Sequence, residues 1–135
     1  MDLQLEKVRE YFSNDKYASM TGAVVDSVGE CTAQCSLEIT DLHRNAMGGV
    51  MGAVYFTLAD FTFAVASNAY MDEPDVVAVS GTISYLNACK GNKLTAKAVC
   101  TKEGRTTCNY IVTVSDDTGR DVATVMFVGC HTKRR

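Results

Sequence analysis

The densest group of residues able to do chemistry lies between Asn45 and Asp60. Asn45 is followed by three glycines, Gly48, Gly49 and Gly52, and then by a long apolar segment whose one charged residue is Asp60. Backbone N–H groups at the start of a helix have no partner within the helix, and they attract negative charge. A carboxylate in apolar surroundings is a candidate general base or nucleophile. Together these groups suit attack on a carbonyl whose developing oxyanion is held by N–H groups.

The same residues also have interpretations that involve no chemistry. Glycines permit tight turns and close packing, and the residues alone do not decide between this role and oxyanion binding. Asp60 is alternatively the partner of a cation or a helix cap. Nucleotide hydrolysis is rejected because the pattern G-x-x-x-x-G-K-[ST] is absent. The only histidines are His43 and His131, and no Ser/His/Asp set accompanies them. We expect a surface or packing role for a lone histidine such as His43.

Gly52 and Asp60 are too far apart to act together within one chain. Their separation of eight residues corresponds to about 12 Å along a helix. If both act on one carbonyl group, one of them must come from another subunit, which predicts at least a dimer. Residues 121–130 are apolar at nearly every position, and a strand that is apolar on both faces also indicates self-association.

Strand-like segments surround this group of residues. Residues 2–12 have apolar residues at helical spacing, which predicts a short amphipathic helix over one end of a sheet. Strict alternation over 31–39 predicts a half-buried strand, and 20–28 is its expected hairpin partner. Glycine- and aspartate-containing turns separate four further predicted strands. These strands cover 76–88, 93–101, 106–115 and 121–130.

Residues 50–71 form an apolar run with Asp60 near its middle. Such a run is either a membrane span or a core helix. A charge at the centre of a span costs roughly 2.5–3.5 kcal/mol, and many strands surround the run. We therefore expect a long helix wrapped by an antiparallel sheet, which is an α+β fold with one domain over 1–135.

The composition argues against several classes of function. The net charge is −3 and no basic stripe with interleaved aromatic residues is present, so we expect no nucleic-acid partner. The first residues lack the pattern of a signal peptide, and six cysteines then indicate a reducing, cytoplasmic location. No cysteine pair has C-x-x-C spacing, so we expect no metal site. The basic tail from Lys133 to Arg135 is expected to be a solvated terminus.

The stretch from Asn45 through Gly48 and Gly52 to Asp60 resembles the signature of hot-dog thioesterases of the phenylacetate-degradation (PaaI-like) type. The order of the elements fits over nearly the whole chain. The resemblance implies a hot-dog fold and hydrolysis of an acyl- or aroyl-CoA thioester to the free acid and CoA. It also implies dimers or dimers of dimers, with sites across the dimer interface. The CoA thioester is then the substrate, and no cofactor is expected.

The resemblance assigns roles to individual residues. Asp60 activates water or attacks the thioester directly, and the N–H of Gly52 polarises the carbonyl. Asn45 helps to hold the carbonyl or the water, and Ser80 is the nearest candidate for a hydroxyl that some members use on the next strand. CoA phosphates are expected to meet basic side chains at the mouth of the cleft. The candidates are Lys90, Lys93, Arg105 and the C-terminal basic run.

One departure from the family pattern is Met51, which stands where a histidine usually precedes the glycine. The loss of this polar group keeps an alternative open, in which the same fold binds an acyl-CoA without hydrolysing it. A hot-dog dehydratase or hydratase is less consistent with the sequence, because those enzymes use an Asp/His pair in a different loop. The acyl group itself is not specified. Tyr55, Phe56 and Phe61 are candidates for its pocket, and core packing is the competing role for each.

Overall fold

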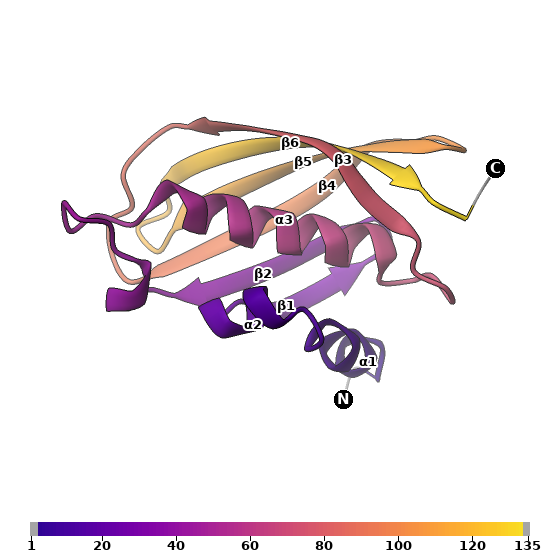
Figure 1. The fold of residues 1–135 in the computed structure, drawn as a ribbon, viewed down its shortest axis with the longest axis horizontal. Helices are drawn as coiled ribbons and strands as arrows, with labels where there is room; N and C mark the ends of the chain where they lie inside the picture. Colours follow the sequence, from indigo (N-terminus) through magenta and orange to yellow (C-terminus); the bar gives the residue numbers. More distant parts are fainter. Residues whose placement is uncertain (1–2, 134–135) are drawn as a thin grey trace.

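The structure, a computed structural model, describes residues 3–133 and consists of a six-stranded antiparallel sheet curved around one long helix (Figure 1). The order across the sheet is β1-β2-β4-β5-β6-β3. This arrangement confirms the expected hot-dog fold. The elements are α1 (Leu3–Phe12), α2 (Lys16–Thr21), β1 (Val24–Gly29), β2 (Thr32–Glu38), η1 (Asp41–His43), α3 (Gly52–Asn68), β3 (Val76–Tyr85), β4 (Lys93–Glu103), β5 (Thr107–Asp116) and β6 (Asp121–His131).

The core lies between α3 and the inner face of the sheet. Inward residues of β4 and β5 alternate with outward ones, as period-two strands require. Phe63 of α3 stacks on Phe127 of β6 with 4.8 Å between ring centroids, and it meets Tyr110 of β5 edge-on at 5.4 Å. Aromatic pairs of this kind contribute about 0.5–1.5 kcal/mol beyond the burial of their area. They fix α3 against the centre of the sheet.

The helix α3 is shorter and less enclosed than the sequence predicts. It covers 52–68 rather than 50–71. Leu58 and Val65 are fully buried, whereas Asp60 is exposed and Phe56 is half-buried. One stripe of the helix therefore faces α2 and solvent instead of the sheet. Within residues 3–133, no helix combines the length and hydrophobicity needed to cross a membrane.

The strand predicted over 20–28 is wrong in its first half. The helix α2 occupies Lys16–Thr21 and ends at Gly22, whose φ of +95° is the left-handed conformation of a helix cap. The strand β1 begins only at Val24. A helix of six residues is too short to show a periodic pattern in the sequence, so its apolar residues resemble a continuation of the neighbouring strand.

The two edges of the sheet differ in how they are protected. In β1, a bulge lies between Val25 and Ser27, and the Arg9 side chain of α1 donates a hydrogen bond to the Val25 carbonyl at 2.8 Å. The opposite edge is β3, whose ten residues include no charge and expose Val77 and Val79. Edge strands are normally protected by charges, bulges or covering elements. The bulge in β3 is short, so most of this edge remains open to a further strand.

Candidate active site

The loop before α3 is closed by Asn45. The Oδ1 atom of Asn45 accepts hydrogen bonds from the N–H groups of Met47 and Gly49 at 3.0 and 3.1 Å. Its backbone N–H donates to the Gly49 carbonyl at 2.8 Å. Gly48 has a φ of +86°, a conformation that favours glycine. The side-chain oxygen of Asn45 thus shapes the loop, while its Nδ2 group makes no hydrogen bond within residues 3–133.

Gly52 begins α3, and its N–H has no hydrogen-bond partner among the described residues. The preceding residue, Met51, is the N-cap and provides no side-chain cap. The ring of Tyr85 lies over Gly52, because a Cβ added there would come within 2.8 Å of its Cε1 atom. The neighbouring Tyr55 hydroxyl accepts the N–H of Cys89 at 2.8 Å. An available N–H group therefore lies beside an aromatic wall.

Asp60 lies about two turns further along α3, on the stripe that faces away from the sheet. It lines a pocket of about 370 Å³ whose walls include Tyr17, Phe56 and Phe61. Its carboxylate makes no hydrogen bond or ion pair within residues 3–133. Surrounding protein atoms raise the pKa of Asp60 by desolvation, and the nearby charge of Asp15 raises it further. A role as the partner of a buried cation is not supported.

Ser80 is not brought to this pocket within the chain. In the register of β3 with β6, Ser80 lies opposite Val128. The next residue, Gly81, faces α3, because a Cβ there would meet Phe56 at 2.9 Å. Neighbouring residues of a strand point to opposite faces. The Ser80 side chain therefore points away from the helix that carries Asp60.

The basic candidates lie at opposite ends of the sheet. Lys90 and Lys93 flank the turn before β4, at the end where α3 begins (Figure 1). Arg105 lies in the turn after β4, roughly 35 Å away along an 11-residue strand. One group of CoA phosphates cannot reach both ends of the same chain. Lys133 is exposed, and residues 134–135 of the basic tail lie outside the described residues.

His43 is a buried packing residue, as the sequence predicts. Its Nδ1 accepts the N–H of Thr40 at 2.9 Å, and its Nε2 lies 2.7 Å from the carbonyl oxygen of Thr21. The ring therefore caps η1 and joins it to the end of α2. Both ring nitrogens are engaged, so His43 is not available to a substrate.

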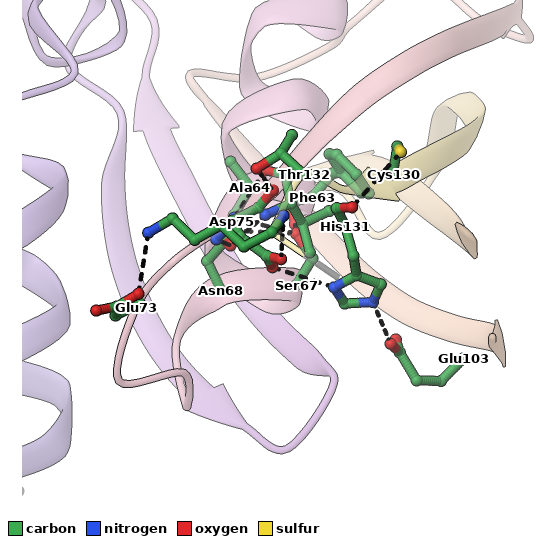
Figure 2. A network of polar contacts seen from close by, with 12 residues as sticks. Phe63, Ala64, Ser67, Asn68, Glu73, Asp75, Glu103, Cys130, His131 and Thr132 are labelled. Carbon is green, nitrogen blue, oxygen red and sulfur yellow. Dashed lines mark hydrogen bonds and ion pairs between the residues drawn. The ribbon is translucent and has the colours of Figure 1, made fainter. Parts of the chain in front are cut away.

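His131 belongs to a polar network that the sequence did not indicate. Its Nδ1 lies 3.1 Å from Asp75 and its Nε2 lies 2.5 Å from Glu103 (Figure 2). Asp75 also accepts the N–H of Lys133 at 3.1 Å, and its own N–H donates to Asn68 at 3.1 Å. The network ties the end of α3 to the ends of β4 and β6. Its members are remote in sequence, so no local spacing could have revealed it.

Relatives of the chain are described as ester or thioester hydrolases. A model of the thioesterase superfamily matches residues 47–123, which include Gly52 and Asp60. A protein of Archaeoglobus fulgidus with the provisional description esterase is 30% identical over 121 residues. That match covers 88% of this chain and 77% of the relative.

Solved structures share the whole fold. The PaaI protein of the E. coli phenylacetic acid degradation operon has a TM-score of 0.85 at 24% identity, covering 95% of this chain and 92% of that one. A hypothetical thioesterase of Streptococcus pneumoniae, solved with coenzyme A, has a TM-score of 0.83 at 25% identity, covering 93% and 98%. The resemblance to the phenylacetate-degradation type is confirmed. With more than half of its length matched by the family model, the chain belongs to the thioesterase superfamily.

Proposed function

We propose that the chain hydrolyses an acyl- or aroyl-CoA thioester to the free acid and CoA, with Asp60 as the base or nucleophile. The position of Asp60 carries this proposal. It is a carboxylate of raised pKa, without a cation partner in residues 3–133, on the central helix of a thioesterase fold and open to an aromatic-walled pocket. The similar protein solved with coenzyme A supports CoA as the carrier of the acyl group.

In the proposed reaction, Asp60 accepts a proton from water while the water oxygen attacks the thioester carbon. In the direct variant, the carboxylate attacks that carbon and water later cleaves the acyl-aspartate. The N–H of Gly52 donates to the carbonyl oxygen as it becomes negative, and Asn45 is proposed to assist through its Nδ2 group. When the C–S bond breaks, the CoA thiolate leaves and takes a proton from Asp60 or from water.

The proposed site is shared between two copies of the chain, as a dimer or a dimer of dimers. Gly52 and Asp60 are about 12 Å apart along α3, so one thioester contacts both only if they belong to different chains. The uncharged edge strand β3 offers the surface for this association, with Val79 and Tyr85 61% and 57% exposed. Tyr85 also covers Gly52, so an interface at β3 would adjoin the helix start. Ser80, which faces away from its own α3, would take part only through such an interface.

The acyl group is proposed to occupy the pocket beside Asp60. Phe61 lines this pocket and also a neighbouring one of about 500 Å³, whose walls include Phe12, Val24 and Val25. Both pockets have largely apolar walls and share the Phe61 side chain. Tyr55, in contrast, is buried and bonded to the Cys89 loop. This supports a hydrophobic or aromatic acyl group without selecting one.

The CoA phosphates are proposed to meet Lys90 and Lys93, near the start of α3. Arg105 can contribute only from another subunit, because it lies at the far end of β4. Neutralising Lys90 and Lys93 together should raise KM for acyl-CoA, and an unchanged KM would remove them from the site.

We propose that the reaction needs no metal or other cofactor. The six cysteines are all free thiols, which supports a reducing, cytoplasmic location.

The substitution Asp60→Asn tests the proposal. We expect kcat to fall by about 10²–10⁴, the usual contribution of a positioned base, with little change in substrate affinity. The melting temperature should hold or rise, because an amide avoids the cost of desolvating a carboxylate. Thiol release from a panel of acyl-CoAs measures the activity.

A purely structural role for Asp60 would give the reverse pattern. The variant would then melt much earlier while keeping its kcat per folded molecule. A wild-type protein that binds acyl-CoAs tightly but releases no thiol from any of them would instead favour the non-catalytic binding module. Equilibrium binding and thiol release, measured on the same preparations, separate these outcomes.

A further inference from the structure

A second group of reactive side chains lies at the opposite end of the sheet, where α3 ends. The ligand atoms of Cys31, Cys100 and Glu103 all lie within 4.8 Å of one another. Glu103, Cys108 and His131 meet the same limit. These side chains come from the turn before β2 and from β4, β5 and β6. Sulfur, oxygen and nitrogen donors from four parts of the chain thus converge around Glu103.

A bulge in β4 brings Glu103 to the same face as Cys100. Cys100 pairs with Tyr110 and Glu103 pairs with Cys108, and both of these β5 residues are buried on the inner face. Paired residues of antiparallel strands share a face, so Cys100 and Glu103 both belong to the inner face. Regular alternation would place residues three apart on opposite faces. The register shift between Cys100 and Lys102 removes this conflict.

His131 is held in the orientation of a metal ligand. Its Nδ1 lies 3.1 Å from Asp75, whose side chain is 2% exposed, and its Nε2 points toward Glu103 (Figure 2). A carboxylate on one ring nitrogen is the arrangement that orients many metal-binding histidines. The N–H of Lys133 also bonds to Asp75. The backbone therefore fixes the carboxylate that orients the ring.

The hydroxyl of Tyr110 is an independent sign that this corner receives a ligand. Tyr110 is 1% exposed, and its hydroxyl makes no hydrogen bond of acceptable geometry within residues 3–133. Burial raises the pKa of Tyr110, followed by close contact with the Cys31 thiol and by the nearby thiols of Cys100 and Cys108. The hydroxyl therefore lies among the thiols. Neutral thiols are weak acceptors for a buried hydroxyl, and a metal-bound thiolate would accept its proton far better.

We propose that this corner binds one soft divalent cation, such as Zn²⁺, through the Cys31 and Cys100 thiolates, the Glu103 carboxylate and Nε2 of His131. Zn²⁺ accepts such donors in a tetrahedron at about 2.0–2.3 Å, and Glu103, which belongs to both groups, would bring them together around the ion. Binding releases the two thiol protons and any proton on Nε2. Cys108 also lies within 4.8 Å of Glu103 and His131, but it is fully buried and is not assigned as a ligand.

The proposed cation is structural and separate from the hydrolysis proposed above. It would join the turn before β2 to the ends of β4 and β6, at the opposite end of α3 from Gly52 (Figure 1). The rival state of the two half-buried cysteines is a disulfide between Cys31 and Cys100, whose backbones are joined by a hydrogen bond of 3.3 Å. A disulfide would consume both sulfur ligands, so the test must distinguish the two states.

The test titrates the reduced, metal-free full chain with Zn²⁺ and with Co²⁺. We expect one ion per chain, a thiolate-to-cobalt charge-transfer band, protection of two thiols from a thiol reagent and a higher melting temperature with Zn²⁺. Cys31→Gly, Cys100→Ser and Glu103→Gln should each weaken binding by roughly 100-fold or more, and Asp75→Asn by about 10–100-fold. Thioester hydrolysis per folded chain should not depend on the ion.

Two variants protect the test against misfolding and non-specific uptake. Cys31 has a φ of 59°, which glycine adopts without strain, so Cys31→Gly removes a ligand while favouring the native turn. Cys130→Ser is the matched control, because Cys130 neighbours His131 in sequence but alternates to the other face of β6. The proposal is overturned by weak uptake without stoichiometry, by affinity unchanged in Cys31→Gly, or by equal loss in Cys130→Ser. Isolation of the chain with a Cys31–Cys100 disulfide that reforms in the presence of Zn²⁺ also overturns it.

Discussion

Asp60 and Asp15 are two carboxylates that line one pocket, from α3 and from the N-cap of α2. Partial desolvation by the walls of the pocket raises the pKa of each carboxyl, and the charge of Asp15 raises the pKa of Asp60 further. A carboxyl whose pKa is higher in the folded state binds its proton more tightly there than in the unfolded chain. The ionised form of Asp60 therefore costs stability above its raised pKa, and this cost shrinks as the pH falls below that value and is gone below the pKa of the unfolded chain. Such a cost is expected of a group retained for chemistry.

The pH dependence of kcat/KM should report this pair. If Asp60 acts in its ionised form, activity falls on the acid side at a pH above the ordinary value for aspartate. Asp15→Asn removes a negative charge, so it should lower the pKa of Asp60. The acid limb of the pH profile, in which activity falls, should then move to lower pH. The Asp15 side chain makes no capping hydrogen bond to α2, so the substitution removes no cap. The exposed Asp72 provides the control, since Asp72→Asn should leave the profile in place. A limb that stays fixed in Asp15→Asn would separate Asp60 from the rate.

The N–H of Gly52 can be removed without breaking α3. Proline is tolerated at the first position of a helix, and Met51 has the extended backbone, φ −65° and ψ 136°, that residues before proline prefer. Gly52→Ala adds a Cβ against Tyr85 but keeps the N–H, so it is the matched control. Relative to Gly52→Ala, we expect Gly52→Pro to lower kcat by about 10²–10³, as for the loss of one oxyanion donor. Equal kcat values at equal folded fractions would exclude the N–H from catalysis.

At the scale of residues, the sequence revealed the groups that are close along the chain. Asp60 can be identified because it is the one charged residue of an apolar helix. Gly52 can be identified because it follows other glycines at the start of that helix. The face of Ser80 could not be predicted, because the bulge between Ala78 and Ser80 adds one residue and reverses the alternation beyond it. The contact of Tyr85 with Gly52 depends on how β3 crosses α3. No periodic pattern in the sequence predicts this contact.

At the scale of elements, most strands followed from alternation, and the exceptions have local causes. The strand β3 ends at Tyr85 instead of residue 88. Beyond Tyr85 the pairing becomes irregular, because the N–H groups of Leu86 and Asn87 both donate to the Val122 carbonyl. The sequence alone predicts that Lys93 and Arg105 meet the same CoA phosphates, but β4 separates them by its whole length. A sequence pattern predicts the length of a strand. It does not predict which end of the strand lies near the start of a helix.

The edge strand β3 can be tested by adding the charge that it lacks. Val79 is 61% exposed on this edge, and Val79→Lys should prevent another strand from adding, because edge lysines oppose strand pairing. Val24→Lys is the matched control on the other edge, where Val24 is 51% exposed. We expect wild type and Val24→Lys to sediment as dimers or larger at micromolar concentration, and Val79→Lys to sediment as an inactive monomer. A fully active monomeric wild type would contradict the shared site.

At the scale of the whole molecule, the two ends of α3 have different roles. The end with Gly52 carries the proposed chemistry, and the end with Asn68 is fixed through Asp75 to His131. Changes at the second end should therefore act on stability and leave the rate per folded chain intact. The matched span of 47–123 includes the helix start but ends before His131. The span includes Cys100 and Glu103 of the proposed cation site, whereas Cys31 and His131 lie outside it.

The length of α3 between Gly52 and Asp60 has a consequence for mixtures of defective chains. If each site takes Gly52 from one copy and Asp60 from the other, an Asp60→Asn chain paired with a Gly52→Pro chain forms one doubly defective site and one intact site. Random exchange of equal amounts would make half of the dimers hybrid, so two inactive preparations should complement each other to about a quarter of wild-type activity. A chain defective in Gly52 and a chain defective in Asp60 would then restore activity to each other. A chain that carries both defects would form no intact site with any partner. A mixture that stays inactive after exchange would mean that each chain carries its own complete site.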